Sequence, residues 1–331
     1  MARLKFNESA ERERTVASVL LKVTETLEPC PVLVIDDLDG HLEDGLRAAG
    51  FTVTRWCRWK VGDRSASAWP AAAEVPFGLV LMRLPRIKDA FEMALHAAAS
   101  VMAADGVLYV AGANDEGIKS STTLIDTVFS DAQTVDTRKH CRVVAARKPI
   151  TTDLRKTLRK WERDMDGWMS YPGVFAKGNI DDATALLIGT LPEKILGSAL
   201  DFGCGGGVIA HAALQRGAKI TMLDADAIAL EAAKQNVDPA TAVLSDGFQE
   251  IVGKFEMILS NPPIHRGAKE DYTVLRDLLE KAPDHLTKDG QLVFVVQRTV
   301  PLKGMGARFT KIEEIAGNTR FKVLKCTLKA N

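Results

Sequence analysis

Two segments of the sequence carry residue types suited to chemistry. The run from Asp201 to Ala210 reads as a strand that ends in a glycine-rich turn and opens a helix. Its glycines have no Cβ and can adopt positive φ, so the backbone can approach a ligand closely at Gly203, Gly205 and Gly207. The turn Asn261-Pro262-Pro263-Ile264-His265 is polar, locked by two prolines, and follows another apolar strand. Together these segments predict a nucleoside-bearing cofactor beside a flat substrate that carries an amino group.

Acidic residues follow two further apolar runs. Asp224 comes twenty-three residues after Asp201, and an acid there suits hydrogen bonds to ribose hydroxyls. Asp246 follows the run 241–244, where its carboxylate can accept a hydrogen bond from an adenine amino group. Ligands of open α/β sheets bind at the carboxyl ends of strands, so Asp224, Asp246 and Asn261 predict one shared site. For the glycine run alone, a tight turn without a ligand is the alternative, because its G-x-G-x-G spacing differs from the dinucleotide fingerprint.

Three blocks of the sequence, 173–181, 201–207 and 261–267, resemble those of class I S-adenosylmethionine-dependent methyltransferases. The tetrapeptide 261–264 is similar to their N/D-P-P-aromatic motif, which occurs in enzymes that methylate exocyclic amino nitrogens. The resemblance is closer still to the ribosomal RNA guanine-N2 methyltransferases of the RsmC type. It extends over residues 167–331 and, more weakly, over the first half of the chain.

This resemblance implies S-adenosyl-L-methionine as cofactor and 16S ribosomal RNA, in the 30S subunit, as partner. The residues that it implies for the cofactor are Asp201, Gly203, Gly205, Gly207, Asp224 and Asp246. The upstream block implies a lid near the methionine end of the cofactor, with Phe175 in it and Asp181 or Thr184 near the cofactor's amino group. Asp181 equally suits capping of the following helix, 183–191. Catalysis is implied for Asn261, Pro262, Pro263, Ile264 and His265.

Ile264 departs from the family, which usually has an aromatic residue, typically Phe, at this position. The aromatic residue stacks on the target base, and such stacking is worth roughly 1–3 kcal/mol. Because Ile264 lacks the π contribution, other substrates stay open: a large-subunit guanine, adenine N6 or a protein glutamine amide. A non-enzymatic ribosome-assembly factor that binds RNA is a further alternative, which the intact glycine run and Asn261 disfavour.

The mechanism follows from the target nitrogen. A guanine N2 lone pair is delocalised into the ring, so the amino group is a poor nucleophile. The Asn261 side-chain carbonyl and the Pro262 backbone carbonyl can each accept one N–H, which orients the amino group and favours sp³ character. His265 can relay the released proton to solvent or, alternatively, hold the loop by a hydrogen bond.

Composition indicates a cytoplasmic enzyme without a metal. The chain has 331 residues, a length typical of about two domains, and 46% of them are hydrophobic. Its charged amino terminus is unlike a signal peptide, and no apolar run reaches the ~18 residues that span a bilayer. The five cysteines are scattered and form no C-x-x-C pair, which argues against both disulfides and zinc.

The charge pattern permits a nucleic-acid partner without requiring one. Net charge is zero, but residues 147–163 hold seven basic residues against two acidic ones, and residues 296–331 hold eight against two. Phosphate contacts need local rather than global positive charge. An ordinary solvated surface is the alternative for both stretches.

An internal duplication organises the chain. Residues 77–86 resemble 255–264, and each half continues through a helix-like stretch and ends on similar strand text. Strands alternate with helical patterns in both halves. The fold expected is α/β, with two tandem Rossmann-like class I methyltransferase domains and antiparallel strands closing each sheet.

The two halves differ in the residues that could do chemistry. The first half has Val34–Gly40 where the second has its glycine turn, and Arg83 where the second has Asn261. We therefore expect a degenerate domain over 1–150 that serves RNA binding or stability, a basic linker helix over 151–166 and a catalytic domain over 167–331. In the first domain, Arg83, Arg86 and Lys88 are candidates for clamping RNA.

Overall fold

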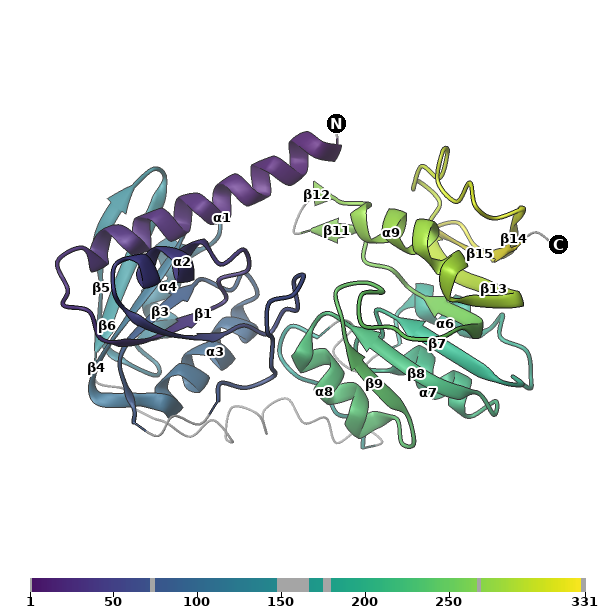
Figure 1. The fold of residues 1–331 in the computed structure, drawn as a ribbon, viewed down its shortest axis with the longest axis horizontal. Coiled ribbons are helices and arrows are strands. Elements are labelled where there is room, and N and C mark those ends of the chain that lie inside the picture. Colours follow the sequence, from purple (N-terminus) through teal and green to yellow (C-terminus); the bar gives the residue numbers. More distant parts are fainter. Residues whose placement is uncertain (1, 72–74, 148–166, 175–179, 267–268, 329–331) are drawn as a thin grey trace. The chain divides into compact units, whose positions relative to one another are not determined.

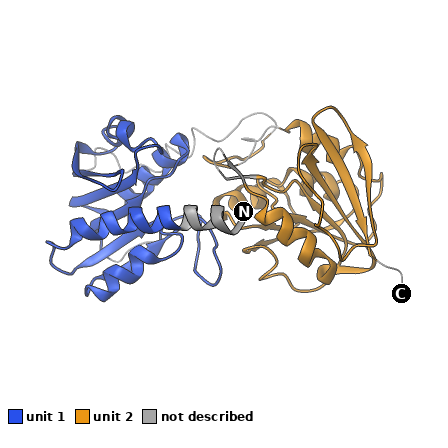
Figure 2. Cartoon of the chain, turned by 90° about the horizontal axis from the view of Figure 1, so that it is seen from above, with its two compact units in different colours: residues 1–162 blue, residues 163–331 orange. Residues whose placement is uncertain are grey.

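The computed structural model describes residues 2–71, 75–147, 167–174, 180–266 and 269–328 (Figure 1). The chain divides into two compact units, Met1–Glu162 and Arg163–Asn331 (Figure 2). The expected linker helix, 151–166, lies outside the described residues. The helix and the domain boundaries at its two ends therefore stay predictions.

Unit 1 is built on a six-stranded sheet of order β2-β1-β3-β4-β6-β5. The first four strands of that order are parallel, and β6 and β5 close the sheet as an antiparallel edge. Its elements, in chain order, are α1 (Ala2–Thr24), β1 (Pro31–Ile35), α2 (His41–Ala48), β2 (Thr52–Trp56), β3 (Phe77–Arg83), α3 (Lys88–Val101), β4 (Met102–Ala113), η1 (Ile118–Ser120), α4 (Ser121–Ile125), β5 (Ser130–Arg138) and β6 (Cys141–Arg147).

Unit 2 is built on a seven-stranded sheet of order β14-β15-β13-β10-β7-β8-β9, in which β15 is antiparallel to its neighbours. A separate two-stranded sheet, β11-β12, is formed by the residues between β10 and α9. The elements are α6 (Asp182–Ile188), β7 (Ser198–Phe202), α7 (Val208–Leu214), β8 (Lys219–Asp224), α8 (Ala227–Asn236), β9 (Thr241–Leu244), β10 (Phe255–Ser260), β11 (His265–Arg266), β12 (Lys269–Glu270), α9 (Thr273–Lys281), η3 (Ala282–His285), β13 (Leu286–Gln297), β14 (Lys311–Gly317) and β15 (Phe321–Thr327).

Helices cover both faces of the unit 2 sheet (Figure 1). Ala199 and Leu259 point into a core shared with α6, α7 and α8, whereas Leu200 and Ile258 point into a core shared with α9 and η3. Burial on both faces explains why these strands read as continuous apolar runs. From β7 the chain proceeds outward to β8 and β9, then returns to β10 on the other side of β7. That reversal creates a crevice at the carboxyl ends of β7 and β10.

The two sheets are copies of one another. Strands β2-β1-β3-β4-β6-β5 correspond in order and direction to β8-β7-β10-β13-β15-β14, and unit 2 adds β9. The copies even share an irregularity: the pairing shifts between Phe77 and Leu79 in one and between Phe255 and Met257 in the other. The predictions of two parallel-rich α/β sheets and of antiparallel closing strands are confirmed.

A glycine at the same position of each copy explains the shared irregularity. A Cβ on Gly106 would lie 3.0 Å from the Phe77 carbonyl oxygen, and a Cβ on Gly290 would lie 2.8 Å from that of Phe255. Both glycines therefore let one long strand cross its neighbour at close range. The glycine that opens each of these apolar runs in the sequence is thus a packing requirement.

Within the described parts of the chain, none of the helices combines the length and the apolar character that crossing a bilayer would need. The same residues bring no three His, Cys, Asp or Glu side chains together in a way that could hold a metal ion. All five cysteines are free, and four of them are buried.

Candidate active site

The turn after β7 has a backbone that requires glycine. Gly203, Gly205 and Gly207 have φ of 72°, 52° and 88°, a left-handed conformation that residues with a Cβ rarely adopt. Gly207 also lies so close to the end of α8 that a Cβ would be 2.8 Å from Val237 Cγ2. At Gly203, by contrast, no described atom outside the adjoining residues lies within 4 Å of a Cβ position. The turn packs tightly at its end and leaves open space at its start.

Asp201 lies inside β7 and is fully buried. Its Oδ2 accepts the N–H of Ala210 at 2.9 Å, while its Oδ1 has no hydrogen-bond partner among the described residues. Burial, with a smaller contribution from the charge of Asp224, raises the pKa of Asp201 to about 7. A cation beside Oδ1 would favour the charged carboxylate and would supply the missing partner.

Asp224 ends β8 and joins two loops. Its Oδ2 accepts the N–H of Gly205 and its Oδ1 accepts the N–H of Asp226, both at 2.8 Å. Burial, with the nearby charge of Asp226, raises the pKa of Asp224 to about 6. The side chain remains partly exposed, and each carboxylate oxygen has a second lone pair. Asp224 can therefore accept hydrogen bonds from two neighbouring hydroxyls of a ligand.

Asp246 lies at the end of the neighbouring strand. Ser245, just before it, is fully buried, and its N–H donates to the carbonyl oxygen of Asp224 at 3.0 Å. The Ser245 hydroxyl donates to the carbonyl oxygen of Gly247 at 2.8 Å and fixes the turn. Asp224 and Asp246 therefore lie at the same edge of the sheet, and Asp246 is partly exposed there.

Asn261 is tied to the same edge through the residue before it. The fully buried hydroxyl of Ser260 donates to the carbonyl oxygen of Phe202 at 2.8 Å. This bond joins the ends of β7 and β10 at the reversal of strand order. Asn261 and Gly203 directly follow the two joined residues, so the glycine turn and the Asn-Pro-Pro turn start side by side. Pro262 is buried, and Pro263 is exposed.

The rest of the Asn-Pro-Pro turn leads into the β11–β12 loop. Ile264 is half-buried and packs against the core between the sheet and α9. Its carbonyl oxygen accepts the N–H of Asp271 at 2.9 Å, which closes the loop. His265 belongs to β11, but the structure does not describe its side chain. The proton-relay role of His265 stays a prediction.

The upstream block meets Asn261 through α6. Asp181 caps this helix, because its Oδ1 accepts the N–H groups of Ala183 and Thr184 at 3.0 and 3.2 Å. The capping interpretation of Asp181 is confirmed, and its contact with a cofactor stays a prediction. Thr184 Oγ1 accepts the side-chain N–H of Asn261 at 3.0 Å. Phe175 lies outside the described residues.

Comparison with known proteins places this geometry in a family. The family model of the methyltransferase small domain matches residues 167–325, and that of the methyltransferase small domain N-terminal matches residues 17–163. The ribosomal RNA small subunit methyltransferase C of Pseudoalteromonas translucida is 34% identical, and the match covers 75% of this chain and 76% of that protein. The protein of the same name from Alteromonas mediterranea is 30% identical, over 86% and 81%. The chain belongs to the ribosomal RNA small subunit methyltransferase C family.

A solved structure shows the same architecture. The T. thermophilus 16S rRNA N2 methyltransferase RsmC, in complex with AdoMet and guanosine, matches with a TM-score of 0.79 over 95% of this chain and 92% of that chain. At 20% identity this likeness shows a common fold. The predicted membership of the RsmC-type family and the predicted pair of tandem domains are confirmed.

Asn236 has a structural role that the sequence around it does not indicate. Asn236, at the end of α8, donates through Nδ2 to the carbonyl oxygens of Gly206 and Met169 at 2.9 and 2.8 Å. Its Oδ1 accepts the N–H of Met169 at 2.6 Å. Asn236 thereby joins the start of the second unit to the glycine turn. No motif signals this role, because the bonded residues are distant in sequence.

The burial and the ion pairs of Arg83 argue against its proposed role in an RNA clamp. Its buried guanidinium lies 2.8 Å from Glu13 Oε2 and 2.8 Å from Glu116 Oε2. Burial lowers the pKa of Arg83, but the charges of Glu13 and Glu116 outweigh it and raise the pKa above its usual value. Arg86 also pairs with Glu116, at 2.5 Å, whereas Lys88 is exposed.

The two basic stretches are less available than their composition indicates. Most of 147–163 lies outside the described residues. In 296–331, five basic residues form ion pairs, and the acidic partners come partly from distant elements. The pairs are Arg298–Glu314, Arg308–Asp284, Lys311–Glu313, Arg320–Asp182 and Lys325–Glu313. For this stretch the solvated-surface alternative is favoured.

Proposed function

We propose that this protein transfers a methyl group from S-adenosyl-L-methionine to the exocyclic N2 amino group of a guanine in 16S ribosomal RNA. The observation that carries the proposal is the Ser260–Phe202 hydrogen bond, which brings the Asn-Pro-Pro turn beside the glycine turn. A group that orients an amino nitrogen is thus adjacent to a turn that can approach a nucleoside. The family relatives, named for methylation of small-subunit ribosomal RNA, support the same substrate.

The residues present fit this cofactor. Asp224 would bind the ribose hydroxyls, Asp246 the adenine amino group, and the open space at Gly203 would admit the ligand beside the backbone. Asp201, whose Oδ1 has no described partner, would face the cationic ammonium of the methionine part. When bound, the cofactor supplies a methyl group on a sulfonium, which is a good leaving group.

The chain's own contribution to the reaction is orientation. Asn261 Oδ1 and the Pro262 carbonyl oxygen accept the two N–H groups of the target, so its nitrogen points toward the cofactor side of the crevice. Pro262 has no N–H that could compete for the target, and the two proline rings limit the turn to one shape. Positioning of this kind contributes up to ~7–11 kcal/mol to lowering a barrier. No strong base is needed, since the nitrogen's proton becomes acidic only after transfer.

For the first unit we infer a supporting role. It has the fold without the glycine turn and without an amide at the end of β3, so it lacks both parts of the site. We assign it to stability and substrate contact, and we take the assembled 30S subunit, in the cytoplasm, as the substrate particle.

Product mapping tests the proposal. Undermodified 30S particles and free 16S RNA are incubated with the protein and labelled cofactor, and the labelled nucleoside is identified. N2-methylguanosine at one position is the expected product, with particles labelled faster than free RNA. Labelled N6-methyladenosine, labelled protein or no label at all would overturn the assignment.

A further inference from the structure

We propose that Thr184 is a positioning residue that holds the Asn261 side-chain amide with its carbonyl end toward the target amino group. The inference rests on the proposed function and deepens it. Thr184 lies in the first turn of α6 and is 5% exposed, and its Oγ1 is 3.0 Å from Asn261 Nδ2. The two residues are 77 positions apart in sequence and meet at the end of β10.

The two ends of the amide are not equivalent for this substrate. The carbonyl end accepts hydrogen bonds and the NH2 end only donates them. An amino nitrogen whose lone pair is delocalised offers only N–H groups, so Oδ1 must face it. If Nδ2 faced the target, its N–H groups would point at the N–H groups of the amino nitrogen, and no hydrogen bond could form.

In the orientation present, the Thr184 hydroxyl accepts from Nδ2 and anchors the amide. A hydroxyl can also donate to a carbonyl, so the anchor comes from Thr184 and the N–H groups of the target favour the carbonyl end. Asn261 Oδ1 accepts no hydrogen bond from the described residues and remains available for the substrate. With valine in place of Thr184, Nδ2 would face a methyl group and lose its acceptor. The amide would then be free to turn Nδ2 toward the open crevice, where it would oppose the N–H donors of the target.

The position of Thr184 is itself fixed. Asp181 holds the backbone N–H of Thr184 at 3.2 Å as part of the helix cap, and α6 packs against the sheet through Ala183 and Leu187. Thr184 therefore presents its hydroxyl from a rigid element, which a residue that holds one amide orientation requires.

Unit 1 shows what the same contact becomes when it has no substrate to orient. There the end of β3 carries Arg83, and the helix before the first strand carries Glu13, with Arg83 Nε 2.8 Å from Glu13 Oε2. Every nitrogen of Arg83 has a partner: Glu13, Glu116 or the carbonyl oxygen of Leu84. The contact between helix and strand end is kept in both copies, but only the Thr184–Asn261 pair leaves an acceptor open.

Thr184→Val tests the inference, with Thr184→Ser as the conservative variant. For the valine variant we expect kcat on undermodified 30S particles to fall about tenfold, while the Kd for S-adenosylmethionine, measured by calorimetry, stays within twofold. Serine keeps the acceptor and should restore kcat to within twofold of wild type. Thr190→Val is the matched control: it removes a hydroxyl bonded to the Leu187 carbonyl just beyond the same helix, and it should leave kcat unchanged.

A double-mutant cycle separates orientation from support of the loop. In an Asn261→Ala background there is no amide to orient, so Thr184→Val should change the residual rate less than twofold. A further tenfold loss in that background would overturn the inference, as would a valine variant within twofold of wild type or a serine variant no better than valine. Failure of the proposed function is distinguishable, because the wild-type protein itself would then leave the particles unmethylated.

Discussion

The two units build the same turn and use it in opposite ways. Asp36 and Gly203 occupy matching positions after the first strand, with φ of 61° and 72°, and Gly40 and Gly207 begin the next helix with φ of 75° and 88°. The backbone hydrogen bond is also shared: Asp36 N–H donates to the Trp56 carbonyl oxygen as Gly203 N–H does to that of Leu223. The degenerate copy has therefore kept the backbone of a cofactor turn.

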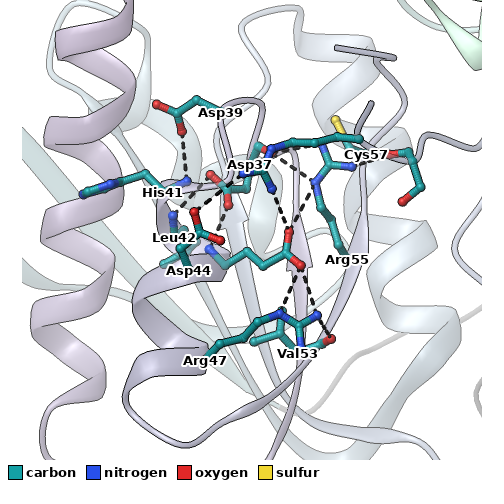
Figure 3. Close-up of polar contacts among 12 residues, drawn as sticks. Asp37, Asp39, His41, Leu42, Asp44, Arg47, Val53, Arg55 and Cys57 are labelled. Atoms are coloured by element: carbon teal, nitrogen blue, oxygen red, sulfur yellow. Dashed lines mark hydrogen bonds and ion pairs between the residues drawn. The ribbon is translucent and has the colours of Figure 1, made fainter. Parts of the chain in front are cut away.

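What differs is the side chains that fill the space. In unit 1 the Asp37 carboxylate accepts the N–H groups of Leu42 and Glu43 at 3.4 and 2.8 Å, so the start of α2 is occupied from within (Figure 3). Arg55 donates twice to the Asp37 carbonyl oxygen. Cys57, a buried thiol whose pKa burial raises to about 12, stands where unit 2 has Asp224. Side chains thus fill the space beside a turn whose backbone resembles that of unit 2.

The recess beside the turn in unit 1 is too small for a cofactor. It lies between α1 and the turn and has a volume of about 10 Å³, roughly the room of one water molecule, whereas ligand pockets typically measure 300–1,000 Å³. Its walls include Glu13 and Leu20 of α1, the acidic turn residues Asp36 and Asp37, and Arg83. Cofactor binding therefore depends more on the space that side chains leave beside the turn than on the backbone conformation of the turn.

Gly205→Val should have the largest effect on the difference between the two units. A branched Cβ at φ 52° is strained, and the strain would disturb the backbone N–H that Asp224 accepts. Affinity for S-adenosylmethionine should fall more than about 100-fold by calorimetry, with the far-ultraviolet circular dichroism retained. Leu38→Val, at the matching position of unit 1, is the control and should leave the affinity and the single-site stoichiometry unchanged. Retained affinity in the glycine variant would mean that the turn is structural in both copies.

Chemistry and binding separate at Asn261. Asn261→Ala removes the acceptor for the target amine but leaves the glycine turn and Asp224 intact. Turnover on particles should fall at least ~100-fold, which is about 2.7 kcal/mol in barrier height, while cofactor affinity stays within a few-fold. Near-normal turnover in single-turnover assays would show that the active site lies elsewhere.

At Arg83, the counterpart of Asn261, the expected loss is in stability. Arg83→Ala would leave Glu116, whose side chain is 3% exposed, without its main partner. Breaking a buried ion pair costs about 3–5 kcal/mol, so urea denaturation should show a loss near 3 kcal/mol with cofactor affinity unchanged. Arg86→Ala is the control, since Arg86 is 44% exposed and such pairs contribute about 0–1 kcal/mol. If Arg83→Ala weakened RNA binding without loss of stability, the result would support the RNA-clamp role of Arg83.

These contrasts show what the sequence can and cannot reveal. Repeated apolar runs predict the duplication, and Gly106 and Gly290 recur in them because the close approach of two strands leaves no room for a Cβ. The positive φ of Asp36 has no such signal, since only its tertiary setting selects that conformation from those that Asp tolerates. The Thr184–Asn261 and Asn236–Gly206 bonds join residues remote in sequence. The neutralised basic stretch likewise depends on Asp182 and Asp284, which the fold brings from elsewhere.

A smaller, pH-dependent effect is expected at Asp201, where unit 1 has Val34. With its pKa raised to about 7, Asp201 is protonated below that pH in the free protein. Its folded pKa exceeds its unfolded value, so stability should fall as pH rises from about 4 to 7. If Asp201 faces a cationic ammonium, cofactor affinity should rise about tenfold from pH 6 to 8 as the ionised fraction grows. Asp201→Asn should reduce the slope of both profiles and leave the part that is due to Asp224, whose pKa is raised to about 6. An unaltered slope would locate the titration in another group.

The smallest expected effect concerns Ile264, which matches Arg86 of unit 1. Ile264→Phe would add a stacking face, but the residue is half-buried against the α9 core, so only part of the roughly 1–3 kcal/mol of a stacked base is gained. We expect KM for 30S particles to fall about threefold, with kcat within twofold. Ile264→Leu is the control, because it changes shape without adding a π face and should leave KM unchanged. If leucine lowers KM as much as phenylalanine does, the gain comes from packing of the loop, and the target base does not lie on this residue.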